Sequence, residues 1–263
     1  MRGNNRHGIV IQERDRRLLE ELAVMRVVDR EQARIVGGFR STTRVNTRLL
    51  ALNRAGLLRR FFLGATAGGR KALYALSMQG AAVIGLPVRG PRRRNDEVLV
   101  ADFFISHQLA VNQIYCALKY GAMPVPGVSF CRWIPFSEPF AHDLGLIPDG
   151  YFELKTPSGV MAAFLEVDLG HERLAVWKEK VRKYLQLAIS GDCERRFGQS
   201  QFRVLVIANS ERRLLSIRKV VRASTQKVFW FTTIESMRHQ GFFAPAWLRP
   251  GSDERQTLLT QIQ

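Results

Sequence analysis

The sequence predicts a two-domain α+β protein, in which a basic helical module with a β-hairpin precedes a larger α/β domain built on a mixed sheet. Helical patterns followed by two strand patterns fill residues 10–76. A run rich in Pro, Gly and Arg then interrupts the chain. Beyond it, helical patterns alternate with apolar strand patterns, an order typical of helices packed on a sheet. We therefore expect domains at 1–87 and 98–245, a linker at 88–97 and a polar tail at 246–263.

The balance of charge indicates the class of partner. The 263 residues include 40 Lys and Arg against 23 Asp and Glu, a formal net charge of +17, and 32 of the basic residues are Arg. Residues 1–97 hold 20 basic and 8 acidic residues, so the excess is concentrated in the first domain. Arginine forks suit phosphates and guanine edges, which favours nucleic acid as the partner. A solvated basic surface and a patch for anionic membranes are the alternatives.

The cysteines and the hydropathy indicate the compartment. Cys116, Cys131 and Cys193 are odd in number and widely spaced, which suits reduced thiols in a cytoplasm. They form no CxxC pair, so we expect no structural zinc site. The sequence also has no uncharged apolar run of roughly 18 residues and no apolar segment of signal-peptide length, so we expect no membrane association.

The first domain begins with three helical patterns. Asp29 is placed to cap the second helix and Ser41 to cap the third. In the third, Val45, Leu49 and Leu52 recur at helical spacing and predict the buried side. Strand patterns over 57–63 and 70–76 flank the turn GATAGG, and a short helix over 77–86 closes the domain. The three helices are expected over residues 13–25, 31–38 and 42–56.

Three helices followed by a hairpin is the order of a winged helix-turn-helix, and the segment LLALNRAGLLRR resembles the end of its recognition helix. The resemblance implies that the third helix enters the DNA major groove and that the hairpin touches the neighbouring backbone. Long cationic forks and short hydroxyls suit these contacts. A winged helix that binds proteins instead is the alternative. The DNA-binding candidates are Arg40 just before the helix, Thr43, Arg44, Thr47 and Arg48 on it, and Arg70 and Lys71 on the wing.

Carboxylates on two neighbouring strands of the second domain predict a metal site. Because side chains alternate along a strand, Glu166 and Asp168 share one face. Asp149 stands at a Pro-Asp-Gly corner on the strand before, across the turn KTPSG, where its carboxylate would converge with Glu166. Such oxygen ligands suit Mg²⁺ or Mn²⁺, so the three acids are the expected metal ligands. Alternatively, Asp149 only begins a turn and the other two acids are exposed on an edge hairpin.

The order Asp149…Glu166-Val167-Asp168 resembles the PD-(D/E)xK nuclease superfamily, in which a lysine is expected where Asp168 stands. In that motif the lysine polarises the attacking water. The next helix, similar to that of RecB-like members, carries Lys180 one turn before Tyr184. By this resemblance Lys180 replaces the motif lysine and Tyr184 orients it, and these two are the expected catalytic residues.

The whole pattern resembles the replication-relaxation proteins of plasmids and integrative elements, over about residues 10–235. The most specific part is EVDLGHE, residues 166–172. The resemblance implies a DNA-binding protein of a mobile genetic element that acts on double-stranded DNA, with a homodimer and replication or transfer proteins as partners. Two hypotheses follow. One is metal-dependent nicking or cleavage of DNA; the other is a non-catalytic regulator or accessory factor that uses an inactive nuclease fold for dimerisation or docking.

Overall fold

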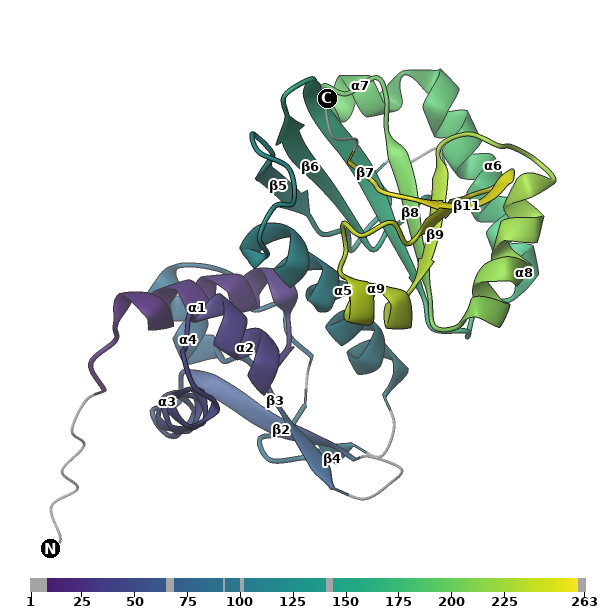
Figure 1. Cartoon of the computed structure of the whole chain (residues 1–263). Helices are drawn as coiled ribbons and strands as arrows, with labels where there is room; N and C mark the ends of the chain where they lie inside the picture. The colour runs from purple at the N-terminus through teal and green to yellow at the C-terminus, as the bar shows by residue number, and fades with distance from the viewer. Residues whose placement is uncertain (1–8, 65–68, 92, 100–101, 141–143, 260–263) are drawn as a thin grey trace, which may run out of the picture. The chain divides into compact units, whose positions relative to one another are not determined.

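The computed structural model describes residues 9–64, 69–91, 93–99, 102–140 and 144–259, and the chain divides into two compact units, residues 1–116 and 117–263 (Figure 1). Each unit combines helices with a sheet, so the predicted mixed α and β fold class is confirmed. Within the described ranges, no helix is long and apolar enough to cross a membrane.

The first unit has the element order of a winged helix. Its elements are α1 (Glu13–Met25), β1 (Val28–Asp29), α2 (Arg30–Val36), α3 (Thr42–Arg54), β2 (Leu58–Gly64), β3 (Arg70–Leu76), α4 (Met78–Ile84), β4 (Val98–Leu99) and most of α5 (Phe103–Tyr120).

Both predicted helix caps are present. The Asp29 carboxylate accepts a hydrogen bond from the Gln32 amide at 2.8 Å, and the Ser41 hydroxyl accepts one from the Arg44 amide at 3.3 Å. Each satisfies a backbone donor that the first turn of a helix would otherwise leave free. On α3, the predicted apolar line of Val45, Leu49 and Leu52 is fully buried.

A four-stranded sheet in the order β1-β3-β2-β4 completes the first unit. Strands β2 and β3 form an antiparallel hairpin whose register runs from Leu58 opposite Leu76 to Gly64 opposite Arg70. Residues 65–68 of the predicted turn GATAGG lie outside the described part of the chain.

Helix α5 begins at Phe103, a few residues after the expected start of the second domain at residue 98. Val98 pairs with Phe62 as part of the short strand β4, parallel to β2. Asp102 then accepts a hydrogen bond from the Ile105 amide at 3.1 Å, which caps the first turn of α5. The predicted linker is also tied to the sheet, because the side chain of Arg59 donates to the carbonyl oxygen of Pro91 at 2.8 Å.

Most of α5 packs in the first unit, which therefore extends to residue 116 and not to the expected border before residue 98. The Asn112 amide donates to the carbonyl oxygens of Met25 and Val27, at 3.0 and 2.6 Å. On the same helix, Ile105 and Leu109 pack in a buried cluster with residues of β2 and β3. The Asn112 side chain thus satisfies carbonyl groups at the end of α1 and just after it.

The second unit is a seven-stranded mixed sheet in the order β11-β10-β9-β8-β7-β6-β5. Its elements are β5 (Ser129–Ile134), β6 (Gly150–Thr156), β7 (Gly159–Asp168), α6 (Leu174–Ser190), α7 (Asp192–Phe197), β8 (Arg203–Ala208), α8 (Glu211–Arg222), β9 (Phe229–Thr233), α9 (Ile234–Gln240), β10 (Trp247–Arg249) and β11 (Ser252–Gln256).

The centre of this sheet is parallel and its margins are antiparallel. The predicted β6–β7 hairpin is present, with Thr156 opposite Gly159, and β7, β8 and β9 run parallel. Helices α6 and α8 cover one face of the sheet (Figure 1). Trp177 and Tyr184 of α6 pack there in one core with Phe164 of β7, which places α6 directly over the strand that carries the acids.

The prediction of a polar tail over residues 246–263 is wrong for residues 247–256, and residues 260–263 lie outside the described part of the chain. Residues 247–249 form β10, which pairs antiparallel with β9, and residues 252–256 form β11, which pairs antiparallel with β10. Trp247 and Leu248 of β10 are buried, and the Arg218 guanidinium of α8 donates to the carbonyl oxygens of Arg249 and Ser252. Two strands of three and five residues carry too short a pattern to stand out between Pro, Gly and charged residues.

Candidate functional site

The centre of the site is Glu166, near the end of β7. Its side chain is 1% exposed, and each of its oxygens has one partner on α6. Oε1 accepts a hydrogen bond from the Tyr184 hydroxyl at 2.5 Å, and Oε2 accepts one from Nζ of Lys180 at 2.8 Å. Burial raises the pKa of Glu166, and the nearby charge of Asp149 raises it further against the opposing effect of Lys180. The structure thus brings Glu166, Lys180 and Tyr184 together.

Lys180 bridges two carboxylates. Its Nζ also donates to Oε1 of Glu172 at 2.8 Å and lies 5.1 Å from the centre of the Trp177 ring. Burial alone would lower the pKa of Lys180, but the charges of Glu166 and Glu172 outweigh burial and raise it. The lysine therefore holds a fixed positive charge beside Glu166. One turn of helix separates Lys180 from Tyr184, so both side chains reach the same carboxylate.

Asp149 lies at the corner that leads into β6, beside the end of β7. Its Oδ2 accepts a hydrogen bond from the Val167 amide at 2.6 Å, and its own amide donates to the carbonyl oxygen of Leu165 at 3.0 Å. Both contacts are with neighbours of Glu166 in β7. The hairpin therefore brings the Asp149 carboxylate next to the strand segment that carries Glu166.

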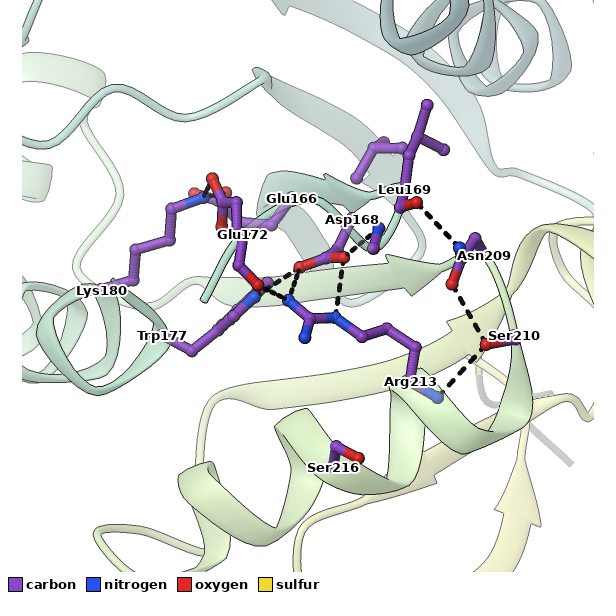
Figure 2. A network of polar contacts seen from close by, with 12 residues as sticks. Glu166, Asp168, Leu169, Glu172, Trp177, Lys180, Asn209, Ser210, Arg213 and Ser216 are labelled. Atoms are coloured by element: carbon purple, nitrogen blue, oxygen red, sulfur yellow. Dashed lines mark hydrogen bonds and ion pairs between the residues drawn. The ribbon is translucent and has the colours of Figure 1, made fainter. Parts of the chain in front are cut away.

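Asp168 has a different environment from the one the sequence predicts. It is 2% exposed, and its carboxylate accepts four hydrogen bonds (Figure 2). Oδ1 accepts from the Gly170 amide at 2.6 Å and from Nε of Arg213 at 2.9 Å. Oδ2 accepts from the Trp177 indole at 2.6 Å and from Nη2 of Arg213 at 2.7 Å. With these four sites engaged, the carboxylate acts as a tie between β7, α6 and α8.

The hydrogen bonds also keep Asp168 ionised. Burial alone would raise the pKa of Asp168, but the hydrogen bonds from Arg213, Trp177 and Gly170 together hold it below its ordinary value. Arg213 lies in the first turn of α8, where its amide donates to the capping hydroxyl of Ser210 at 3.3 Å (Figure 2). Its Nη2 also donates to the carbonyl oxygen of Glu172. Asp168 therefore stands apart from the Glu166–Lys180 pair although both acids share one face of β7.

A divalent ion at this site would take only part of its ligands from the protein. Over the described ranges, no group of three or more His, Cys, Asp or Glu side chains is arranged to hold a metal. Mg²⁺ is commonly held by one or two carboxylates together with waters and substrate phosphates. Asp149 and Glu166 supply two such carboxylates, and Oε2 of Glu172 is buried without a hydrogen-bond partner. That unsatisfied acceptor is an observation in favour of a further donor or cation at this place.

Two residues of the site were missed in the sequence. Glu172 closes the segment 166–172 but falls in the loop before α6, where periodicity gives no information on direction. Arg213 lies 45 residues after its partner Asp168. Its cap residue Ser210 predicts the start of α8, but nothing in the sequence predicts that the first turn of α8 adjoins the end of β7.

Some of the DNA-binding residues predicted on α3 and just before it are exposed and form no ion pair with the described residues. Arg40, Thr43, Arg44 and Thr47 are exposed, and neither arginine forms an ion pair with the part of the chain that the structure describes. On the wing, Arg70 is exposed, whereas Lys71 pairs with Oδ2 of Asp29 at 2.5 Å and remains 53% exposed.

Arg48 does not lie with them. Its Nε donates to Oδ1 of Asp15 at 2.8 Å, its Nη2 to Oδ2 of the same residue and to the carbonyl oxygen of Val10. The Asp15 side chain is fully buried, and the side chain of Arg48 is 20% exposed. Arg48 therefore links α3 to α1, and its expected role as a groove-facing residue is corrected. The reason is a buried acid, which is stable as a charge only when paired.

A comparison with family models adds the identity of the chain. The model described as replication-relaxation matches residues 14–201, well over half of the sequence. The chain belongs to the replication-relaxation family. This family indicates a role in the replication or relaxation of plasmids and other mobile elements, and its match extends through both the winged helix and the Glu166–Lys180 pair. No curated protein and no solved structure matches the chain.

Proposed function

We propose that this replication-relaxation protein binds double-stranded DNA through its winged helix and cleaves or nicks it at a metal-dependent site around Glu166. The observation that carries the proposal is the 2.8 Å contact between Lys180 and Glu166. It supplies a lysine to the acid pair from α6, at a site where β7 itself has Asp168 in the place of the motif lysine.

The charges of the first unit support DNA as the substrate. Arg40, Arg44 and Arg70 are exposed on α3, its approach and the wing. Exposed guanidinium groups without acidic partners can release the counterions of a DNA backbone and bind its phosphates. The hydroxyls of Thr43 and Thr47 lie exposed on the same helix and are short enough for close approach to bases.

In this proposal Asp149 and Glu166 hold a Mg²⁺ or Mn²⁺ ion. When bound, such an ion lowers the pKa of its water and offsets the charge of a phosphodiester. Lys180 holds its proton throughout, because two carboxylates stabilise its charge, and it offers that charge to a phosphate oxygen beside Glu166. Tyr184 fixes the orientation of Glu166 by donating its hydroxyl proton to Oε1. Asp168 and Arg213 maintain the end of β7 from the other side.

One observation favours a second candidate function, a non-catalytic accessory factor. The Glu166 carboxylate is 1% exposed and both of its oxygens already have partners. A buried carboxylate with both oxygens paired is also what a purely structural role requires, in which Glu166 holds α6 on the sheet. In that case the second unit would act as a scaffold for a homodimer or for replication or transfer proteins.

A cleavage assay on supercoiled plasmid separates the two. The purified full chain is incubated with Mg²⁺ or Mn²⁺, with EDTA as the metal-free reference, and nicked and linear products are quantified. Asp149→Asn and Glu166→Gln remove one charge each from the metal site, and Glu235→Gln removes one from an exposed position on α9. We expect cleavage by the parent chain and by Glu235→Gln, and only background from the other two.

DNA binding, measured by fluorescence anisotropy, should be equal in all four proteins because none of the changes lies in the first unit. If the parent chain binds DNA but neither metal supports cleavage, the nuclease proposal is wrong and the accessory role stands. Cleavage that survives Asp149→Asn and Glu166→Gln would place the active site elsewhere.

A further inference from the structure

The second unit has a cavity of about 570 Å³ at the end of the sheet where β8 and β9 begin. Its walls combine apolar side chains, among them Val160, Phe202 and Leu258, with polar ones such as Ser158 and Gln201. Across β7 and β8, Ala163 pairs with Arg203 at this end and Asp168 with Ala208 at the other. Glu166 lies three residues from Ala163, roughly 10 Å along β7, and alternation puts the two side chains on opposite faces of the strand. Glu166 does not line the cavity, so the cavity is distinct from the Glu166 site.

Two arginines and a tryptophan form the charged part of this cavity. Arg203 of β8 and Arg249 of β10 both line it, as does Trp230 of β9. The guanidinium carbons lie 4.8 and 4.5 Å from the centre of the Trp230 ring, respectively. Both cations are therefore held against one aromatic side chain, an arrangement that fixes their positions without neutralising their charge.

Neither arginine has an acidic partner among the described residues. Arg203 donates to the carbonyl oxygen of Leu258 at 2.5 Å and contacts Sδ of Met161 at 3.4 Å. Arg249 donates to the carbonyl oxygen of Gln226 at 3.2 Å. Burial lowers the pKa of both arginines, and the charge of Arg249 lowers that of Arg203 further. By contrast, the nearby Arg218 pairs with Asp253 at 2.7 Å.

Besides the two arginines without acidic partners, the cavity lining includes an unsatisfied hydrogen-bond donor, the indole N–H of Trp230. The residue is 8% exposed, and its indole N–H is buried without a hydrogen-bond partner. A buried donor without an acceptor costs free energy, and a ligand that brings an acceptor to this place would recover that cost.

We propose that this cavity binds a phosphate monoester carried on an apolar or aromatic body of nucleotide size. Two uncompensated guanidinium groups match a phosphate monoester, which carries about −1.5 to −2 at neutral pH, better than the single charge of a carboxylate. The volume lies within the roughly 300–1,000 Å³ of small-molecule sites and far exceeds the need of inorganic phosphate alone. The apolar part of the lining, including Val160, Phe202 and Leu258, then receives the body of the ligand. The proposal does not depend on cleavage at Glu166.

The shared chemistry has two sources, a free nucleotide and the 5′-phosphate end of a DNA strand. Calorimetry on the full chain with AMP, adenosine and inorganic phosphate tests the first. Anisotropy with one oligonucleotide, prepared with a 5′-phosphate and with a 5′-hydroxyl, tests the second, because binding through the winged helix is the same for both.

The variants are Arg249→Gln, Arg249→Lys and Trp230→Phe, with Arg212→Gln as the control. Arg212 is an exposed residue of α8 that does not line the cavity, so its change removes the same charge without touching the site. We expect adenosine to bind at least tenfold more weakly than AMP, and Arg249→Gln to weaken phosphate-dependent binding at least tenfold, since a charge-assisted hydrogen bond is lost. Arg249→Lys should weaken it less, Trp230→Phe a few-fold, and Arg212→Gln less than twofold.

Phosphate-dependent binding of either AMP or the 5′-phosphorylated strand, lost in Arg249→Gln and kept in Arg212→Gln, supports the proposal and identifies the source. Equal binding of AMP and adenosine overturns it. So does an oligonucleotide whose affinity ignores the 5′-phosphate together with no binding of AMP, or a phosphate preference that Arg249→Gln, Arg249→Lys and Trp230→Phe all leave unchanged.

Discussion

Arg213 of α8 and Asp168 of β7 form a two-point ion pair, with Nε 2.9 Å from Oδ1 and Nη2 2.7 Å from Oδ2. The position at which the PD-(D/E)xK pattern has a lysine thus carries a buried acid whose countercharge comes from another helix. Two residues earlier, Glu166 obtains its countercharge from Lys180 of α6. Each acid on this face of β7 therefore has its own cation, and the two pairs hold α6 and α8 on the sheet.

Asp168→Lys, the change that restores the motif lysine, is expected to destabilise the protein and not to increase cleavage. It would place a second cation against Arg213 and leave the Trp177 indole without its acceptor. Breaking a buried ion pair costs about 3–5 kcal/mol. Urea unfolding measures the loss, with Glu235→Lys as an exposed control for the same change of charge. A variant as stable as the parent chain would show that the pair has no structural role.

Asp102 should make the free energy of unfolding depend on pH in the acid range. Its carboxylate caps α5 and pairs with Arg93 at 2.5 Å. Although burial raises the pKa of Asp102, the hydrogen bonds from Arg93 and Ile105 bring it below its ordinary value. Because the folded pKa is the lower one, the contribution of the charge is present above the unfolded pKa of about 3.9 and is lost as the pH falls through the folded pKa.

We therefore expect Asp102→Ala to cost about 1 kcal/mol at pH 7, the value of an N-cap, and less below about pH 4. Asp102→Asn keeps a capping oxygen and removes only the charge, so it should cost less at pH 7. Denaturant unfolding of the three proteins across this range is the measurement. A cost of Asp102→Ala that stays constant from pH 7 to about pH 3 would contradict the role of the charge.

The sequence predicted the parts of the fold that depend on local pattern. The caps Asp29 and Ser41 and the hairpin of β6 and β7 follow from neighbours within a few residues. Helical spacing also predicts that Lys180 and Tyr184 lie on the same side of α6, where both contact Glu166. What the pattern could not predict are contacts between distant segments.

Arg48 and Asp168 show why contacts between distant segments could not be predicted from the sequence pattern. An exposed and a paired arginine look alike in a helical pattern, and only the fold brings the buried Asp15 of α1 to Arg48 of α3. Likewise, the alternation of β7 places Asp168 on the correct face but says nothing of Arg213 above it. The strands within residues 247–256 were not predicted because they have no long apolar run of their own. They are held by contacts with Arg218 and with the edge of β9.

Lys180 and Tyr184 should be energetically coupled through Glu166. Tyr184→Phe removes the hydroxyl that donates to a buried oxygen, at an expected cost of about 1–3 kcal/mol. Lys180→Met leaves the same carboxylate without its cation. Because both changes act on one carboxylate, the double variant should depart from the sum of the single costs by about 0.5–3 kcal/mol in a double-mutant cycle. Strict additivity would mean that the two side chains do not share Glu166 in solution.

Arg44 and Arg48 lie one turn apart on α3, but their changes to alanine should affect different quantities: DNA affinity for Arg44 and folding stability for Arg48. Arg44 is exposed, so Arg44→Ala should weaken DNA binding and reduce the slope of log K against log salt by about 1, with unfolding changed by less than ~0.5 kcal/mol. Arg48→Ala leaves the buried Asp15 unpaired and should cost about 3–5 kcal/mol of stability, with a smaller effect on the salt slope of the folded protein. Anisotropy titrations at several salt concentrations and urea unfolding measure the two quantities on the same samples. Equal loss of DNA affinity in both variants, without loss of stability in Arg48→Ala, would return Arg48 to the DNA-binding surface and remove the tie between α1 and α3.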